Sequence, residues 1–319
     1  MTLFSKYLFN FILKRGRIFI YILPLFITVA CTSVHIPTKT SLLEKNIPTY
    51  HKINAVPVIE QADHYCGPAA LATVAQYNKR SLSQAKAASM VYTKGRKGTF
   101  QHDIVSAIQR LNLLAVPVRS PTDLFIEISQ NYPVLIFQNL GLSWYPTWHY
   151  SVISGYDIDE ENVFIHDGTA QAKWQSMSTV FKTWKRTENW GYIAVSPGTI
   201  PKTATAENLL QSTAQLEAAG HLESAKQSYK AILDHFPKQH AAYFGLGNIA
   251  VTEKNYGLAI KNYKSALSLK TDYVPALNNL GYAYSFSGDT QKACDHLNRY
   301  KTTYTSLKDS YDDLCIIKK

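Results

Sequence analysis

The sequence predicts two consecutive folded parts, an α+β domain over residues 51–197 and an all-α helical solenoid over residues 206–319. In the first part, helix-like segments precede short apolar runs that are typical of strands, and this order favours an α+β domain. The second part repeats small and large residues with a period of 34, as stacked helix pairs do. Hydrophobic residues make up 46% of the 319 residues and charged residues 18%, which excludes wholesale disorder.

The first 31 residues have the pattern of a targeting segment rather than of a folded domain. Basic residues precede the apolar run Ile18–Ala30, and no Asp or Glu occurs before its end. Pro24 interrupts this run, so an anchor helix that spans a bilayer is not its strongest interpretation. No other segment is apolar and long enough to span a membrane, which excludes a multi-pass transporter.

The end of the targeting segment, Thr28-Val29-Ala30-Cys31, resembles the lipobox of bacterial lipoproteins. The resemblance implies cleavage before Cys31 and acylation of this cysteine, while ordinary secretion or an uncleaved anchor stay open as alternatives. Thr32 follows the cysteine rather than Asp, which resembles the pattern of outer-membrane lipoproteins. We therefore expect a lipid anchor in the bacterial cell envelope, at the outer membrane facing the periplasm. Residues 32–50 lack periodicity and are expected to form a tether.

The formal net charge of +10 raises the question of an anionic partner such as nucleic acid. Part of this charge is local, because Lys6, Lys14, Arg15 and Arg17 precede the apolar run. The rest of the chain contains no block of five or six Lys or Arg. We therefore interpret the remaining charge as a solvated surface and expect no nucleic-acid partner.

Hydrophobic patterns place the elements of the α+β domain. Apolar periodicity predicts helices, and short apolar or alternating runs predict strands. The expected helices cover residues 68–77, 83–91, 102–111 and 122–131, and the expected strands cover 134–138, 150–156, 163–166 and 192–195. Because residues 157–162 form a polar turn, the second and third strands are expected to pair as an antiparallel hairpin.

The C-terminal part begins after residues 198–205, which are predicted to be a linker. Three sets of residues then recur in phase: Ala225, Ala259 and Ala293; Thr213, Gly247 and Gly281; and Tyr229, Tyr263 and Leu297. Small residues at this spacing let paired helices approach closely, while the larger ones fill the space between them. The pattern resembles three tetratricopeptide repeats, which implies a surface that binds a protein or peptide. A capping helix is expected near Leu307–Ile317.

Cys66 has the surroundings of a cysteine nucleophile. Pro68 suits the first position of a helix, so Cys66 is expected at a helix N-terminus, where free N–H groups favour a thiolate. A thiolate is the form of cysteine that attacks a carbonyl carbon. Gln61 lies five residues upstream, and its side-chain amide is predicted to form an oxyanion hole with the Cys66 backbone N–H.

A cysteine nucleophile needs a base and a group that orients the base. His149 opens the alternating strand that ends near Gly155, and Asp167 follows the next strand. A hairpin between these strands would bring Asp167 near the level of His149, with His166 pointing to the other face. The order Cys66, His149, Asp167, with Gln61 before the cysteine, is what a papain-like site requires.

These residues resemble those of the peptidase family that processes double-glycine bacteriocin leaders on a papain-like fold. The resemblance is carried by Gln61, Cys66-Gly67, the stretch WHYSVISGYD that contains His149, and FIHDG that contains Asp167. A closer likeness is to envelope lipoproteins that join such a domain to tetratricopeptide repeats, over roughly residues 31–300. It implies a Cys-His-Asp triad acting on a protein or peptide substrate. The leader-processing enzymes are fused to a transporter, so their leader substrate is not implied here.

Other interpretations of the same residues stay open. Cys66 could be a small buried hydrophobic residue, His149 a strand residue and Asp167 a turn residue, in a binding lipoprotein without catalysis. An acyl or amide transferase would use the same thioester intermediate as a hydrolase. We expect no metal ion or cofactor, because the chain has no Cys-x-x-Cys, His-Glu-x-x-His, carboxylate-rich loop or phosphate-binding Gly-rich loop.

The remaining two cysteines, Cys294 and Cys315, lie near the end of the chain. Cys294 lies in the last repeat and Cys315 in the predicted capping helix. In an oxidising periplasm they could pair as a disulfide, and two buried thiols are the alternative.

Overall fold

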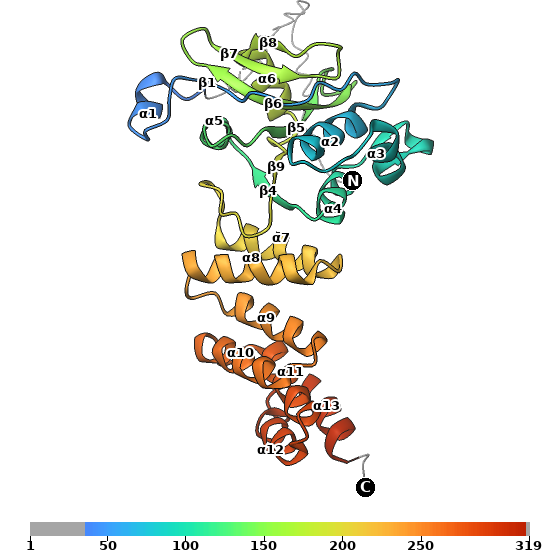
Figure 1. Ribbon diagram of the computed structural model, residues 1–319, viewed down its shortest axis with the longest axis vertical. Helices are drawn as coiled ribbons and strands as arrows, with labels where there is room; N and C mark the ends of the chain where they lie inside the picture. Colours follow the sequence, from blue (N-terminus) through green and yellow to red (C-terminus); the bar gives the residue numbers. More distant parts are fainter. Residues whose placement is uncertain (1–35, 317–319) are drawn as a thin grey trace, which may run out of the picture. The chain divides into compact units, whose positions relative to one another are not determined.

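The computed structural model describes residues 36–316 and has the predicted fold class, an α+β domain with an antiparallel sheet followed by consecutive helices (Figure 1). The predicted targeting segment, including the lipidation site Cys31, lies outside the described residues. Within residues 36–316, no helix combines the length and apolar character that a membrane span needs.

The α+β domain runs from α1 to β9. Its elements are α1 (Lys39–Leu43), β1 (Tyr50–Lys52), α2 (Cys66–Tyr77), α3 (Gln84–Val91), β2 (Tyr92–Thr93), β3 (Gly98–Thr99), α4 (Gln101–Arg110), β4 (Leu114–Val118), α5 (Pro121–Ser129), β5 (Val134–Asn139), β6 (Trp148–Asp157), β7 (Asn162–His166), β8 (Lys173–Ser176), α6 (Met177–Lys185) and β9 (Gly191–Val195). The strand order of the main sheet is β4-β9-β5-β6-β7-β8, with β1 paired to β6 and every pair antiparallel. The strands β2 and β3 form a separate hairpin.

Helices cover both faces of this sheet. On one face, α2, α3 and α4 pack in a core that includes Leu71 and Ile104 together with Leu135 of β5. On the other face, α5 and α6 pack in a core that includes Phe125 and Ile136. Because neighbouring residues of β5 enter opposite cores, its sequence is a continuous apolar run, which is why the run predicted a buried strand.

The segment expected to be a tether is part of the folded body where the structure describes it. Leu42 of α1 and Ile47 are buried in the core beneath α5 and α6. β1 follows directly and pairs with β6. The sequence gives little sign of this packing, because α1 is a single short helix and has too few residues to show a period.

Strand β4 was not predicted, because Pro117 interrupts its apolar run. Proline has no N–H to donate to a ladder and is tolerated at the edge of a sheet. β4 is such an edge strand, paired only with β9 within the described residues. On its open side, the N–H of Ala115 donates to Ser212 Oγ of α7 at 2.9 Å. The helical part therefore covers the edge that β4 leaves open.

The predicted linker does not separate the helical part from the α+β domain. The N–H of Thr203 donates to the side-chain oxygen Oε1 of Glu127 in α5 at 2.7 Å. Leu209 and Leu216 of α7 are buried in the same core as the strands. The first helix of the solenoid is therefore packed as an integral element of the preceding domain.

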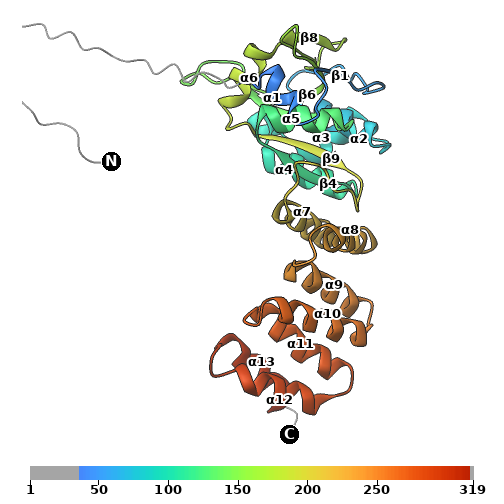
Figure 2. The ribbon, with the colours of Figure 1, turned by 90° about the vertical axis from the view of Figure 1, so that its left-hand side faces the viewer.

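The helical part consists of antiparallel helix pairs that follow one another along the chain (Figure 2). Its elements are α7 (Ala206–Ala218), α8 (Leu222–His235), α9 (His240–Thr252), α10 (Tyr256–Leu269), α11 (Val274–Phe286), α12 (Thr290–Tyr300) and α13 (Ser306–Cys315). The predicted pairing of small with large residues is present, since Gly247 lies against the Tyr263 ring and Gly281 against Leu297. At the end of the chain, Cys294 of α12 and Cys315 of α13 form a disulfide, with Cα atoms 5.8 Å apart.

Replacing Gly247 by Ala is expected to destabilise the helical part. An added Cβ would lie 2.4 Å from the Tyr263 ring, so the ring would have to move out of a packed core. We expect the free energy of unfolding to fall by about 1–3 kcal/mol in urea denaturation of the full chain. The control Gly257→Ala in α10 places its Cβ where nothing lies within 4 Å, and it should leave the stability unchanged or slightly raised. Equal losses for both variants would contradict this account of the repeat packing.

Candidate active site

Cys66 lies at the N-terminus of α2, as the sequence predicts, and the helix begins at Cys66 itself, two residues before the predicted start at Pro68. The residues from Gly67 to Ala75 behind it are all buried, and their small side chains let the helix pack closely on the sheet. The thiol is half-buried and is hydrogen-bonded by the backbone of Cys66, Gly67 and Tyr150. The sulfur therefore lies between the start of α2 and the start of β6.

The hairpin β2–β3 forms a wall beside Cys66 that the sequence analysis missed. Thr99 of β3 packs on Gly67 so closely that a Cβ at this position would lie 2.6 Å from the Thr99 side chain. The hydroxyl of Tyr150 donates to the Thr99 carbonyl at 3.1 Å. Because Thr99 approaches so closely, position 67 has room only for a glycine. The stretch Lys94–Thr99, with two glycines and three basic residues, has the composition of a turn and could have suggested a hairpin.

A cavity of about 520 Å³ opens onto the thiol. It is walled by the β2–β3 hairpin on one side and by aromatic side chains of β5 and β6 on the other. The lining residues are His64, Cys66, Arg96, Lys97, Gly98, Thr99, Phe100, Gln101, Phe137, Trp148 and Tyr150. The lining contains two cations and no carboxylate, so it offers no repulsion to an electron-rich carbonyl group.

His149 is held in one tautomer by the backbone. Its Nε2 lies 3.0 Å from the carbonyl oxygen of Asp167. A carbonyl oxygen only accepts hydrogen bonds, so Nε2 must carry the proton and Nδ1 must carry the free lone pair. Within residues 36–316, Nδ1 has no hydrogen-bond partner. The basic nitrogen of His149 is therefore Nδ1, and it is available to accept a proton.

Asp167 contacts His149 through its carbonyl, whereas its carboxylate was the predicted orienting group. One carboxylate oxygen, Oδ2, forms an ion pair with Lys173 at 2.7 Å, and the other accepts hydrogen bonds from Thr169. These partners on β8 and its preceding loop turn the carboxylate away from the imidazole. The predicted hairpin is present, but Val152 is opposite His166, which leaves Asp167 diagonal to His149 rather than directly across from it.

Gln61 lies beside the end of β7. Its N–H donates to the carbonyl of Gly168 at 2.9 Å, and its side chain packs on the Cα of this glycine. The side-chain oxygen Oε1 is buried and has no hydrogen-bond partner among the described residues. Gly168 has φ +81° and its Cβ would lie 2.2 Å from this oxygen, so only glycine fits here. The structure thus places Gln61 near Asp167 and His149.

Burial keeps the thiol and the imidazole neutral. Burial raises the pKa of the Cys66 thiol above its ordinary value, and the backbone hydrogen bonds at the helix start only partly oppose this. Burial lowers the pKa of His149, against the hydrogen bond and the negative charge of Asp167, which raise it. Burial acts to raise the pKa of Asp167. The hydrogen bonds from Lys173 and Thr169 outweigh this effect, so the pKa of Asp167 lies below its ordinary value. The helix N-terminus therefore does not by itself produce the thiolate that the sequence suggested.

The thiol and the imidazole do not contact each other directly. Among the described residues, no hydrogen bond joins Cys66 to His149. The thiol contacts the backbone of Tyr150, the residue that directly follows His149. Trp148 and Tyr150 line the cavity, and strand alternation directs His149 away from them. His149 does not line the cavity at Cys66, so proton transfer between the two groups requires one of them to change its conformation.

The described residues contain no group of three or more His, Cys, Asp or Glu arranged to hold a metal ion. The two other cysteines of this range, Cys294 and Cys315, are in the disulfide, so Cys66 is the free thiol of residues 36–316.

Comparisons with known proteins agree with this architecture. The family model described as "Peptidase_C39 like family" matches residues 53–194, and the tetratricopeptide repeat model matches residues 240–273 and 274–301. The first predicted repeat, formed by α7 and α8, lies outside these matches. No curated protein matches the chain.

Solved structures resemble each part separately. A protein from Bacillus anthracis described as a C39-like peptidase is 18% identical, with a TM-score of 0.40, over 46% of this chain and 98% of its own. The peptidase domain of Streptococcus ComA, a bi-functional ABC transporter involved in a quorum-sensing pathway, is 22% identical, with a TM-score of 0.36, over 44% of this chain and 98% of its own. MamA is 22% identical, with a TM-score of 0.32, over 34% of this chain and 66% of its own, slightly less than two thirds.

The order of these matches along the chain follows the order of the two folded parts. The C39-like match begins at Ile53, just after β1, and ends within β9, so it includes Gln61, Cys66, His149 and Asp167. The repeat matches cover α9 to α12, and repeats of this kind mediate protein–protein interaction. The chain therefore has a Peptidase C39-like domain over residues 53–194, and tetratricopeptide repeats follow it in the same chain.

Proposed function

We propose that this protein is a cysteine peptidase that hydrolyses a peptide or amide bond with Cys66 as nucleophile and His149 as base. The observation that carries the proposal is the hydrogen bond from His149 Nε2 to the Asp167 carbonyl. This bond leaves a basic Nδ1 on the residue next to the backbone group that contacts the Cys66 thiol. The proposed nucleophile comes from α2, the base from the start of β6 and the group that orients the base from the end of β7.

In the proposed mechanism, the Cys66 sulfur attacks the substrate carbonyl carbon while Nδ1 of His149 accepts the thiol proton. The carbonyl π electrons move to its oxygen and give a tetrahedral oxyanion. When the C–N bond breaks, the imidazolium gives its proton to the leaving amine, and a thioester remains on Cys66. A water molecule, deprotonated by the same Nδ1, then hydrolyses the thioester and regenerates the thiol.

Gln61 and the Cys66 backbone N–H are the proposed donors to the oxyanion. The side-chain oxygen of Gln61 is buried against Gly168, so the amide nitrogen is the end of the group that can donate to a substrate. One such donor contributes about 10²–10³ in rate when it is aimed at the developing charge.

A neutral resting pair favours general-base catalysis over a preformed ion pair. The pKa of the Cys66 thiol is raised and that of His149 is lowered, so both groups are uncharged near neutral pH. Proton transfer then accompanies the attack on the carbonyl rather than preceding it. Asp167 acts on this step through its carbonyl, which fixes the tautomer, and through its charge, which favours the imidazolium.

The proposal extends to the two ends of the chain. Acylation of Cys31 would anchor the protein in the cell envelope of a bacterium, at the outer membrane and facing the periplasm. This is supported by the basic and apolar targeting segment before Cys31 and by its likeness to a lipobox. The disulfide between Cys294 and Cys315 is in keeping with an oxidising compartment. The repeats would bind a protein partner or the substrate itself.

A binding protein without catalysis is the second candidate. It is favoured by the raised pKa of the thiol and by the absence of a Cys66–His149 hydrogen bond among the described residues. The two candidates differ in whether any cleavage depends on the thiol.

The test compares new protein termini in the envelope of cells that carry the wild type or Cys66→Ala. Termini that appear only with the wild type would identify the substrate. On peptides made from such a site, we expect His149→Ala to lower kcat/KM by about 100-fold or more, because it removes the base. Asp167→Asn should lower kcat/KM only by about tenfold, because the backbone carbonyl that fixes the tautomer remains. His235→Ala on the exposed side of α8 is the matched control and should have no effect.

If no terminus depends on Cys66, the protein is not a peptidase and the binding candidate takes its place. An Asp167→Asn loss as large as that of His149→Ala would instead show that the carboxylate, and not the carbonyl, orients the base.

The pH dependence of Cys66 alkylation tests the neutral pair. Because burial raises the pKa of this thiol, the thiolate fraction should rise about tenfold per pH unit from pH 6 to 8.5 without a plateau. The measurement is the rate of iodoacetamide labelling in a Cys31→Ser background, in which Cys66 is the free thiol. The variant His149→Ala should show the same profile, since the imidazole is uncharged over this range. A plateau in the acidic range that His149→Ala abolishes would demonstrate a preformed ion pair.

A further inference from the structure

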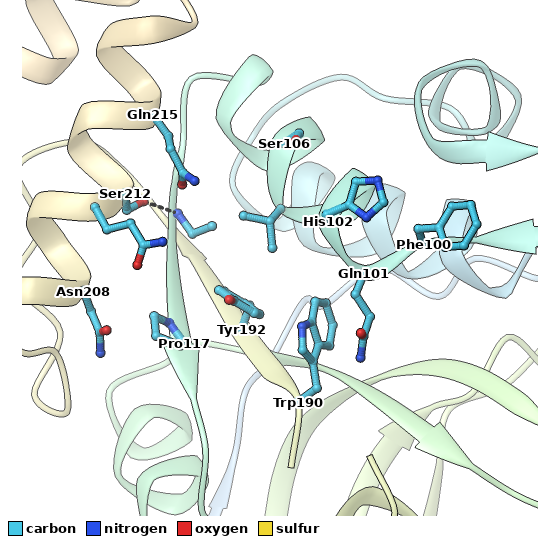
Figure 3. Close-up of a pocket in the computed structure, with 13 residues that line it drawn as sticks. Phe100, Gln101, His102, Ser106, Pro117, Trp190, Tyr192, Asn208, Ser212 and Gln215 are labelled. Carbon is cyan, nitrogen blue, oxygen red and sulfur yellow. Dashed lines mark hydrogen bonds between the residues drawn. The ribbon is translucent and has the colours of Figure 1, made fainter. Parts of the chain in front are cut away.

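A groove of about 420 Å³ lies between the peptidase domain and α7, outside the cavity at Cys66 (Figure 3). It is bounded by α4, β4, β9 and α7. Figure 3 shows its labelled side chains in succession from Asn208 on α7 past Pro117, Tyr192 and Trp190 to Gln101. Phe100 and Gln101 line both this groove and the cavity at Cys66. The two spaces therefore share a wall at the start of α4.

The wall that α7 supplies is fixed in place. Ser212 Oγ accepts the N–H of Ala115 on the edge strand β4 (Figure 3). Gln215 accepts a hydrogen bond from the buried side chain of Gln109. Leu209 and Leu216, on the adjacent face of α7, anchor this helix in the core of the domain. Ligand groups on this helix therefore keep a constant position relative to the peptidase domain.

Some side-chain amides that face the groove form no hydrogen bond within the described residues. Within the described range, those of Gln101, Asn208 and Gln211 have no hydrogen-bond partner. Asn208 and Gln211 are three residues apart on α7 and therefore lie on one face of the helix. Each amide offers one acceptor and two donor hydrogens, which match the alternating N–H and C=O groups of an extended peptide.

The remaining lining favours an uncharged chain segment. The groove contains no Asp, Glu, Lys or Arg, and the rings of Trp190 and Tyr192 form its apolar floor. Addition of a strand to the sheet is excluded, because the open side of β4 is occupied by α7 and Pro117 has no N–H to offer. Recognition must therefore come from side chains rather than from a sheet ladder.

We propose that the substrate cleft continues from Cys66 along this groove and that α7 binds an extended, uncharged segment of the substrate on one side of the cleaved bond. The inference rests on the proposed peptidase function. It assigns a role in substrate length and sequence preference to Asn208 and Gln211, which lie outside the residues that match the C39-like family. The first helix of the solenoid is thereby a part of the peptidase.

The test uses a library of peptides made by digesting denatured envelope proteins, with consumption followed by mass spectrometry. For the wild type we expect kcat/KM to rise as peptides extend on one side of the cleaved bond. In the double variant Asn208→Ala, Gln211→Ala, kcat/KM for the extended peptides should fall about tenfold. The value for the shortest peptides should stay unchanged. Glu207→Ala, an exposed residue of α7 outside the groove, is the matched control and should keep the full gain.

A binding arm separates failure of the groove from failure of the peptidase function. The same library is passed over immobilised Cys66→Ala protein, with or without the two α7 substitutions. The Cys66→Ala protein should retain extended uncharged peptides, and the two α7 substitutions should abolish this retention. Such a result supports peptide binding in the groove even if the wild type cleaves nothing. The inference would be overturned by a length preference that survives the double variant, by cleavage without any length preference, or by equal peptide retention with and without the two α7 substitutions.

Discussion

The hydrogen bond from His149 to the carbonyl of Asp167 fixes the protonation of the candidate base, and the proposed chemistry follows from it. Because a backbone carbonyl cannot donate, the imidazole has one available tautomer, and its basic nitrogen is the one that remains unbonded in the described structure. The bond depends in turn on the pairing of β6 with β7, which sets Asp167 diagonal to His149. The carboxylate of Asp167 is left to Lys173 and Thr169, so it acts on the imidazole through its charge.

The thiol gains its position from a different set of contacts. A helix with small buried residues lies close to the sheet, and its first residue meets the backbone of Tyr150. The same burial that positions the sulfur also opposes its ionisation, and here burial outweighs the hydrogen bonds at the helix start. Under the proposed function, the thiol and the imidazole would both be uncharged before a substrate binds.

The repeats are not a separate module joined by a flexible connection. Helix α7 covers the open edge of the sheet, where β4 would otherwise present an unpaired N–H at Ala115. Its apolar residues enter the core of the peptidase domain, and its polar face turns to the groove that meets the Cys66 cavity. If the proposed function and the proposed groove hold, binding by α7 and cleavage at Cys66 would act on one surface of the protein.

The fold class, the central strands and the 34-residue repeat could be predicted because each depends on local periodicity. Val134–Ile136 is apolar on both faces, and Gly247 and Gly281 recur in phase with their large partners. The site residues Cys66 and His149 could be named from their neighbours along the chain. By contrast, β4, the packing of Leu42 and the role of the Asp167 carbonyl depend on contacts between segments far apart in sequence. Periodicity carries no information about which groups meet there, so those features were decided by tertiary packing alone.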